Sequence, residues 1–472
     1  MHLFCRKVVL IKVGTAFILF TFSVSHSFAQ GPDTLWTKRY GTDDYDIGYD
    51  MQPTSGGGYI IVGQTGVFGA PSGPYLYFIK IDGEHGDSLW AKVYGTDEKA
   101  AIGYSVQETS DGGFIVAGFK EFSANGNRDI YLLKTDSLGD TIWTMTYGGP
   151  YAETYEEVCR SVIQTFDEGY LMAGYTHFFT GSHLYLIKTD SLGDTVWTKT
   201  YGEPDLFASA RSVRQTQDGG YIIAGTIGLI EYHYKGWLLK TDAYGDTLWT
   251  RMYGDDDWDT YFHEMQVTSD SGYIIAGEAH YAYYDRRTYL VKTDRYGTVL
   301  WSRKYLGSFD PLVDILGQSV QEAPDGGFVV VGTRFYSYNN FDIYVIRDDS
   351  CGINFWTQNY GDFEDQEIGY SIQVTAEGNY VIAGSKDSLQ IYDYDVFVMK
   401  TEPDVGIEEQ DTDVRKDNSG ATIFSGPLQL PKDKKCRVFD ITGRVVEPTT
   451  ITPGIYFLEI DGKVIQKVVK IR

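Results

Sequence analysis

A tryptophan that returns at a near-constant interval constrains this chain more than any other feature. The repeated unit is clearest at residues 136–148, where a turn with two aspartates leads into Thr-Ile-Trp and then into Tyr-Gly. Its copies lie about 50 residues apart, and a period of this size indicates a repeat architecture. The central tryptophans of the copies are Trp36, Trp90, Trp143, Trp197, Trp249, Trp301 and Trp356.

The residues between two successive tryptophans predict four strands. In one copy, residues 105–107 alternate polar and apolar side chains, which predicts a first strand with one buried face. An Asp-Gly-Gly turn at residues 111–113 then predicts a hairpin into the apolar run 114–118, which ends in glycine. A third strand at residues 130–136 and a fourth that carries the tryptophan complete the unit. Small four-stranded sheets in tandem are typical of β-propeller blades.

The two ends of the repeat region predict a closed ring. The region begins with a fourth strand alone, at residues 33–40, and ends with a first, second and third strand, at residues 369–401. If these segments pair, they complete a seventh blade and leave only short, protected edges. We therefore predict an all-β fold in which residues 30–402 form a seven-bladed β-propeller closed by the N-terminal strand. An open solenoid is the alternative.

Composition and spacing exclude several classes of function. The chain carries a net charge of −25, which opposes binding to the phosphates of nucleic acids. Apart from Cys5 near the start, three cysteines remain, an odd number that opposes a disulfide framework, and the histidines show no His-x-x-x-His spacing. We therefore predict no nucleic-acid partner, no metal site and no cofactor. His233 and His280 are predicted to lie exposed in loops.

The first residues predict a targeting segment. Arg6, Lys7 and Lys12 precede the apolar run 13–22, and Ser27 and Ala29 supply small residues for cleavage. We predict a signal peptide over residues 1–29. No later apolar run approaches the roughly 18 residues of a membrane span. The expected location is therefore extracellular or at the cell surface.

The C-terminal residues predict a separate module. Charged residues dominate 403–421, which predicts a linker, and two hairpins within 422–472 predict a small β-sandwich. Residues 438–446 (VFDITGRVV), residues 453–457 (PGIYF) and a final strand with Lys467 and Lys470 resemble the C-terminal sorting domain of type IX secretion substrates. The resemblance implies recognition by secretion machinery and export through the outer membrane.

The repeated turn is similar to two known propeller motifs. Its Asp-x-x-Gly-Asp-Thr-x-Trp pattern resembles the Asp-box hairpin of sialidase-like propellers and the tryptophan-docking repeat of quinoprotein propellers. The resemblance implies structural roles for the seven tryptophans and for Asp136, Asp190, Asp242 and Asp294. A sialidase would need three arginines in one central pocket. Arg160, Arg211 and Arg214 lie in or beside the first strands of only two repeats, so we do not expect that activity.

The variable loops predict where binding takes place. In a propeller, the loops between second and third strands share one face with the loops between blades, and here both sets vary and many carry tyrosine. Such loops commonly carry function, and tyrosine suits sugar and protein surfaces. We predict a non-catalytic binder of extracellular glycan or protein, with no catalytic residue. The alternatives are a polysaccharide hydrolase or lyase and a purely structural surface component; the tyrosines could also only pack on neighbouring loops. The predicted binding residues are Tyr232, Tyr234, Tyr281, Tyr284, Tyr336, Tyr338 and Tyr392.

Overall fold

The computed structural model is built of strands, and the described ranges contain no helix. They divide into two compact units, Met1–Asp404 and Val405–Arg472. The structure describes residues 7–13, 16–22, 31–42, 45–70, 73–95, 100–121, 127–148, 156–178, 181–203, 206–229, 233–280, 285–305, 314–337, 340–361, 365–387, 394–404, 422–424, 436–440, 444–446, 454–460 and 463–470.

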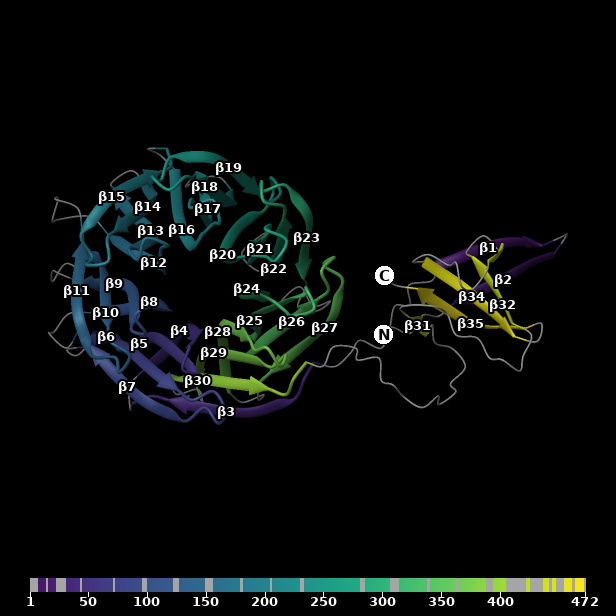
Figure 1. Ribbon diagram of the computed structural model, residues 1–472, viewed down its shortest axis with the longest axis horizontal. Coiled ribbons are helices and arrows are strands. Elements are labelled where there is room, and N and C mark those ends of the chain that lie inside the picture. The colour runs from purple at the N-terminus through teal and green to yellow at the C-terminus, as the bar shows by residue number, and fades with distance from the viewer. Residues whose placement is uncertain are drawn as a thin grey trace. The chain divides into compact units, whose positions relative to one another are not determined.

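The first unit is a ring of seven blades, each with four antiparallel strands that we name A to D from the centre outward (Figure 1). The A strands of blades 1 to 7 are β4 (Asp46–Pro53), β8 (Ala101–Glu108), β12 (Glu157–Gln164), β16 (Leu206–Gln215), β20 (Asp259–Val267), β24 (Asp314–Glu322) and β28 (Gln366–Val374). The B strands are β5 (Tyr59–Ala70), β9 (Phe114–Glu121), β13 (Tyr170–Phe178), β17 (Tyr221–Leu229), β21 (Tyr273–His280), β25 (Phe328–Ser337) and β29 (Tyr380–Asp387).

The C and D strands form the outer half of each blade (Figure 1). The C strands are β6 (Gly73–Ile81), β10 (Arg128–Thr135), β14 (Gly181–Thr189), β18 (Tyr234–Thr241), β22 (Arg286–Thr293), β26 (Asn340–Asp348) and β30 (Tyr394–Thr401). The D strands are β7 (Ser88–Tyr94), β11 (Thr141–Tyr147), β15 (Thr195–Tyr201), β19 (Thr247–Tyr253), β23 (Val299–Tyr305), β27 (Asn354–Tyr360) and, for blade 7, β3 (Thr34–Tyr40).

The ring closes through the strand nearest the N-terminal end of the propeller. β3 pairs antiparallel with β30, with Tyr40 opposite Val396 and Thr34 opposite Thr401. Within the described residues, three pairs of neighbouring blades are also joined by single parallel bridges, Arg128 to Glu156, Ser182 to Phe207 and Phe341 to Gln366. The predicted all-β propeller is confirmed, and the pairing of β3 is the one that the closure hypothesis requires.

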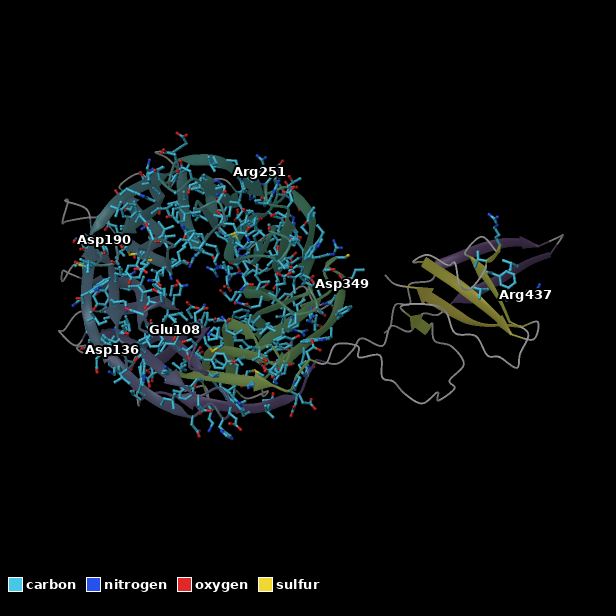
Figure 2. All side chains as sticks on the ribbon, viewed as in Figure 1. Glu108, Asp136, Asp190, Arg251, Asp349 and Arg437 are labelled. Carbon is cyan, nitrogen blue, oxygen red and sulfur yellow. The ribbon has the colours of Figure 1, made fainter. Side chains whose placement is uncertain are left out.

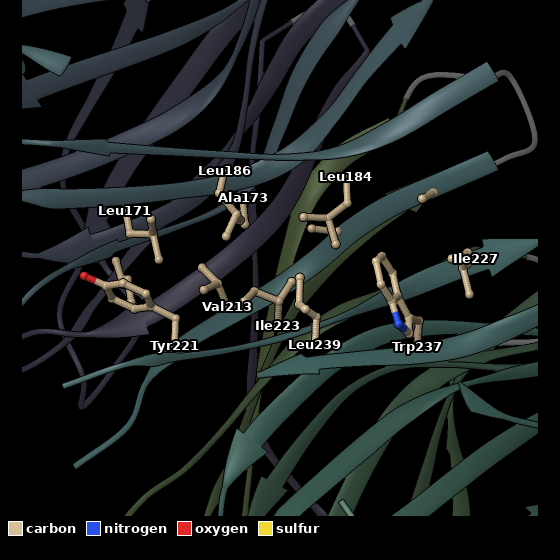
Figure 3. Packing of buried hydrophobic residues seen from close by; sticks show 13 residues of the cluster. Leu171, Ala173, Leu184, Leu186, Val213, Tyr221, Ile223, Ile227, Trp237 and Leu239 are labelled. Carbon is tan, nitrogen blue, oxygen red and sulfur yellow. The ribbon is translucent and has the colours of Figure 1, made fainter. Parts of the chain in front are cut away.

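The hydrophobic core lies between neighbouring blades. Between blades 3 and 4, Leu171 and Leu186 pack in one cluster with Val213, Ile223 and Leu239, all at most 1% exposed (Figure 3). The B strands are apolar on both faces because each face contacts another blade. Full burial of such a side chain stabilises the folded state by roughly 1.5–3 kcal/mol. The interfaces between blades therefore hold the ring together.

On the outer side, each D-strand tryptophan lies against a glycine of the next blade. A Cβ atom at Gly139 would lie 2.8 Å from the indole of Trp90. Gly139 also has a φ of +77°, and its carbonyl accepts a hydrogen bond from the hydroxyl of Tyr94. The glycine therefore meets two demands, a left-handed turn and close contact with the ring. The equivalent pairs are Trp36–Gly86, Trp143–Gly193, Trp197–Gly245, Trp249–Gly297, Trp301–Gly352 and Trp356–Gly31.

The aspartate that opens each repeated turn binds the backbone of that turn. Oδ1 of Asp136 accepts hydrogen bonds from the backbone N–H groups of Leu138 at 2.9 Å and Asp140 at 2.8 Å. Asp136 and Asp190 lie at the outer rim of the ring (Figure 2). The same two bonds are formed by Asp190, Asp242 and Asp294.

The second unit contains one five-stranded sheet. Both predicted hairpins are present, and β32 also pairs with β34, which joins them into a single sheet. The described strands of this unit include no second layer. They are β31 (Thr422–Phe424), β32 (Cys436–Asp440), β33 (Val445–Val446), β34 (Gly454–Ile460) and β35 (Lys463–Lys470).

The residues of the predicted signal peptide include two short paired strands. β1 (Lys7–Val13) and β2 (Ala16–Phe22) are antiparallel. Cleavage of this segment stays a prediction. Across the described ranges, no helix is long and apolar enough to span a membrane.

Candidate functional site in the central channel

Every A strand carries a β-bulge at the same place. In blade 2, Gly103 pairs with Gly118 and Ser105 pairs with Ala117, so Tyr104 between them has no partner in the ladder. A bulge turns its extra residue out of the regular alternation. The bulged residues of blades 1 to 7 are Tyr49, Tyr104, Arg160, Arg211, His263, Gln318 and Tyr370.

The glycine of each B strand makes room for the bulge. A Cβ atom at Gly118 would lie 1.8 Å from the carbonyl oxygen of Ile102, which the bulge pushes toward the B strand. The contact is with backbone and cannot be relieved by a side-chain rotation. Equivalent contacts of 1.7 to 2.0 Å occur at Gly63, Gly174, Gly225, Gly277, Gly332 and Gly384. The repeated glycine is therefore required by the bulge and not by a turn.

The bulged side chains meet in a pocket of about 520 Å³ at the centre of the ring. All seven line it, together with serines of the next position and glutamines two residues further on, such as Ser105 and Gln107. Each A strand runs from the loop between blades toward the tight A–B turn. The ring of bulged residues therefore lies nearer the loop-rich face than the ring of glutamines does.

The residue after each bulge ties neighbouring A strands together. Oγ of Ser105 accepts a hydrogen bond from the backbone N–H of Val162 at 3.1 Å. The belt of such bonds runs around the whole channel, with Ser212 donating instead to the carbonyl of Met265 at 3.3 Å. The other members are Asp50 with Val106 (2.9 Å), Ser161 with Val213 (3.2 Å), Glu264 with Val320 (3.3 Å), Ser319 with Ile372 (3.2 Å) and Ser371 with Met51 (3.2 Å).

Three neighbouring blades contribute tyrosines, which we call the aromatic arc. The ring centroids of Tyr49 and Tyr104 lie 5.0 Å apart, and those of Tyr49 and Tyr370 lie 5.4 Å apart. Burial raises the pKa of both Tyr49 and Tyr370 above the ordinary value. Both hydroxyls therefore stay protonated at neutral pH. The hydroxyl of Tyr49 donates a hydrogen bond to Oε1 of Gln64 at 3.0 Å, and that of Tyr370 can donate to a ligand. An aromatic surface with polar tips suits a sugar ring.

The next two blades contribute arginines, which we call the cationic arc. The guanidinium of Arg160 lies 3.9 Å from the ring centroid of Tyr104, a cation–π contact that joins the two arcs. Arg211 is exposed to the solvent of the channel. A third arginine of the pocket, Arg214, is held by Glu264, with Nη2 3.1 Å from Oε1.

Blade 5 adds a histidine that is backed by a buried carboxylate. Oε1 of Glu278 lies 3.5 Å from Nε2 of His263 and 3.1 Å from Nε2 of His280. Burial of Glu278 would raise its pKa, but its contacts with both histidines outweigh this effect and hold the pKa well below its usual range. His263 lines the channel, so it can exchange a proton there, and the carboxylate of Glu278 lies behind its ring. His280 is only 18% exposed in its side chain, and its predicted exposure is wrong.

Two carboxylates of the pocket are already used by the wall. Asp50 accepts hydrogen bonds from Val106 and from Nε2 of Gln52, the latter at 3.2 Å, and Glu264 binds Arg214. Burial raises the pKa of both carboxyl groups. The described residues contain no group of three or more His, Cys, Asp or Glu side chains placed to hold a metal ion.

Two of the seven tyrosines predicted to bind lie within the described ranges. Tyr234 is half-buried and packs between Phe207 and Tyr261. Its ring centroid lies 5.5 Å from that of Phe207 and 5.3 Å from that of Tyr261. Tyr336 is half-buried, and its hydroxyl accepts a hydrogen bond from Asn359 at 2.7 Å. A binding role for these residues stays a prediction. Tyr232, Tyr281, Tyr284, Tyr338 and Tyr392 lie outside the described residues.

The bulged residues are not among the site residues predicted from the sequence. Arg160, Arg211 and Arg214 were not expected to share a pocket, whereas the structure places all three in the channel. A signal was present: two consecutive positions, such as Arg160-Ser161, interrupt the alternation of every A strand. Together with the glycine that ends each B-strand run, this interruption indicates a bulge.

No known protein family matches the sequence, and no curated protein matches it significantly. The chain is similar in structure to a protein of unknown function from Dyadobacter fermentans, with 10% identity over 79% of this chain and 100% of that chain and a TM-score of 0.49. It is also similar to a polysaccharide lyase, ulvan lyase, with 9% identity over 76% of this chain and 92% of that chain and a TM-score of 0.46. A third similar structure is an α-L-arabinanase from Penicillium chrysogenum, with 10% identity over 79% of this chain and 98% of that chain and a TM-score of 0.43. At these identities the likeness concerns the fold alone.

One sequence-based prediction is corrected at this point. The chain was predicted not to be an enzyme, because no catalytic motif is visible in the sequence. The solved structures that it resembles include a lyase and an arabinanase, which are enzymes. The seven bulges also bring tyrosine, arginine and histidine side chains from distant repeats into one pocket, which a search for local motifs cannot detect.

Proposed function

We propose that this protein is an exported enzyme that cleaves an extracellular polysaccharide in its central channel. The observation that carries the proposal is the ring of seven bulged residues, which places an aromatic arc, a cationic arc and His263 around one pocket. The aromatic arc offers a surface for a sugar ring, and His263 with Glu278 behind it offers acid–base chemistry.

Two reactions fit a polysaccharide substrate. In hydrolysis, water adds across the glycosidic bond. In elimination, a base removes the C5 proton of a uronate, its electron pair forms the C4–C5 double bond, the C4–O bond breaks, and the leaving oxygen takes up a proton. In either reaction His263 is the residue of this pocket best placed to move a proton. Tyr370 keeps its hydroxyl proton at neutral pH and can donate a hydrogen bond to the substrate.

A polysaccharide panel tests this proposal. The full secreted chain is incubated with neutral, uronate-bearing and sulfated polysaccharides. New reducing ends report cleavage of either kind, and ultraviolet absorbance of unsaturated uronates reports elimination. We expect His263→Gln to lower the rate by about 100-fold or more, as loss of a general acid or base does. His85→Gln is the matched control, since His85 is exposed in a C–D turn.

Two outcomes would contradict the proposal. One is the absence of cleavage across the whole panel. The other is a rate that His263→Gln leaves equal to that of the His85→Gln control, which would place any activity outside the channel.

We propose further that the loop tyrosines extend the sugar-binding surface and that residues 1–29 and 422–472 direct export through secretion machinery. The supports are the tyrosine-rich variable loops, the charged and apolar pattern of the first segment, and the resemblance of the last one to sorting domains. Mass spectrometry of the secreted protein's ends would show whether either segment is removed. Retention of both at full secretion would contradict processing.

A further inference from the structure

The charge of the channel is opposite to that of the whole chain. The chain carries a net charge of −25, yet Arg160 and Arg211 stand next to each other in the ring of bulged residues. Within the described part of the chain, neither guanidinium forms an ion pair, and Nε of Arg160 is buried without a hydrogen-bond partner. Arg214 differs from both, because Glu264 already neutralises it.

Without a bound anion, the two arginines destabilise the folded protein. Although Arg211 is accessible from the channel, the protein atoms around the pocket limit its hydration. This desolvation and the neighbouring charge of Arg160 lower the pKa of Arg211 to about 10, while Tyr175, Tyr104 and Glu278 offset part of this effect. Arg211 remains charged at neutral pH. Two like charges in a partly desolvated pocket repel each other, and an anion placed between them would replace that repulsion with attraction.

The surroundings of the pair indicate which kind of anion fits. Arg160 lies on the face of Tyr104, so the cationic arc continues directly into the aromatic arc. A guanidinium binds carboxylate and sulfate groups through two parallel hydrogen bonds, which a lysine cannot do. The adjoining tyrosine rings favour a ligand whose acid group is attached to a sugar ring.

We propose that Arg160 and Arg211 bind the acid group, a carboxylate or a sulfate ester, of an acidic sugar whose ring lies on the aromatic arc. The inference rests on the proposed function, because this sugar is a residue of the polysaccharide that the channel takes up. It adds the substrate class: an acidic polysaccharide rather than a neutral one.

Calorimetric titration of the full chain tests the proposal with three oligosaccharides of equal length. One carries uronates, one carries sulfate esters on neutral sugars, and one is neutral. We expect the neutral oligosaccharide to bind at least tenfold more weakly than one of the acidic ones. Arg160→Gln and Arg211→Gln should each remove about tenfold of the affinity for that acidic ligand, and Arg211→Lys should restore it only in part. Arg251→Gln, at the outer rim (Figure 2), is the control and should change nothing.

Thermal unfolding separates loss of binding from loss of fold. Because Arg211 is repelled by Arg160, Arg211→Gln should unfold at the same or a higher temperature than the unchanged protein. Equal binding of acidic and neutral ligands, or full affinity in both arginine variants, would overturn the inference even if the enzyme cleaves neutral polysaccharide. Arginine-dependent binding of the acidic ligand without cleavage would support the inference and leave the proposed function refuted. Tighter binding of the uronate-bearing oligosaccharide would identify the acid group as a carboxylate, and tighter binding of the sulfated one would identify it as a sulfate ester.

Discussion

The backbone N–H of Met51 donates a hydrogen bond to Oγ of Ser371 at 3.2 Å, across a sequence separation of 320 residues. It joins the first and last A strands and completes the belt that runs around the channel. The nearby pairing of β3 with β30 closes the same blade on its outer side. The wall that carries the candidate site is therefore continuous, because the residue after each bulge is bonded to the A strand of the next blade.

Ser371→Ala should lower the free energy of unfolding by about 1–2 kcal/mol, because the N–H of Met51 is left buried without a partner. Urea denaturation followed by tryptophan fluorescence measures the change. Ser137→Ala is the matched control, since Ser137 is exposed in a C–D turn and should be neutral. Equal stability of the two variants would show that the belt contributes nothing at the closure.

Gly118→Ala should be among the most damaging single changes in the chain. Its Cβ would lie 1.8 Å from the carbonyl oxygen of Ile102, so the bulge at Tyr104 must flatten or shift. Overpacking of this kind costs about 1–3 kcal/mol or more. Thermal unfolding measures the loss of stability. The affinity for the acidic oligosaccharide should also fall, because Tyr104 moves. Gly56→Ala, where a Cβ meets nothing within 4 Å, is the control; a fully stable Gly118→Ala protein would refute the role given to this glycine.

Glu367 should make the propeller less stable as the pH rises. It is 1% exposed, and burial, followed by the charges of Asp365 and Asp342, raises its pKa to about 7 although Lys386 opposes the shift. Because the folded pKa lies above the unfolded value of about 4.3, the contribution of this group is fully present below that value. It is lost as the pH rises through about 7, and the difference between the two pKa values corresponds to a total loss of about 4 kcal/mol of stability.

Glu367→Gln should remove this pH dependence. Denaturant unfolding at pH 4.5 and pH 8 would show a smaller loss of stability in the variant than in the unchanged protein, by up to about 3 kcal/mol. Glu84→Gln serves for comparison, because Glu84 is exposed in a turn. An unchanged difference between the two pH values would mean that Glu367 titrates normally.

Asp136→Ala should cost about 1–2 kcal/mol, because two backbone N–H groups of the turn lose their acceptor. Asp140→Ala in the same turn removes only an exposed ion pair with Lys92 and should cost less than about 1 kcal/mol. Chemical denaturation of both variants measures their free energies of unfolding. A larger loss of stability in Asp140→Ala than in Asp136→Ala would contradict the structural role of the first aspartate.

The repeats explain why so much of the fold could be predicted from the sequence. Seven copies of a short pattern predict the same strands seven times. The single D strand at residues 33–40, which no A, B or C strand precedes, indicates how the ring closes. The candidate site could not be predicted in this way. Arg160, Arg211 and His263 each occupy a position that other blades fill with tyrosine or glutamine, so no local motif marks them.

The sequence by itself determined the strand order and the turns, because these depend on contacts within one repeat or between consecutive repeats. Only the tertiary structure decided which side chains meet. A bulge turns one residue of each A strand inward, and closure of the ring brings residues from all seven blades to one axis. Their chemistry as a group arises from that convergence, which no segment of the chain contains.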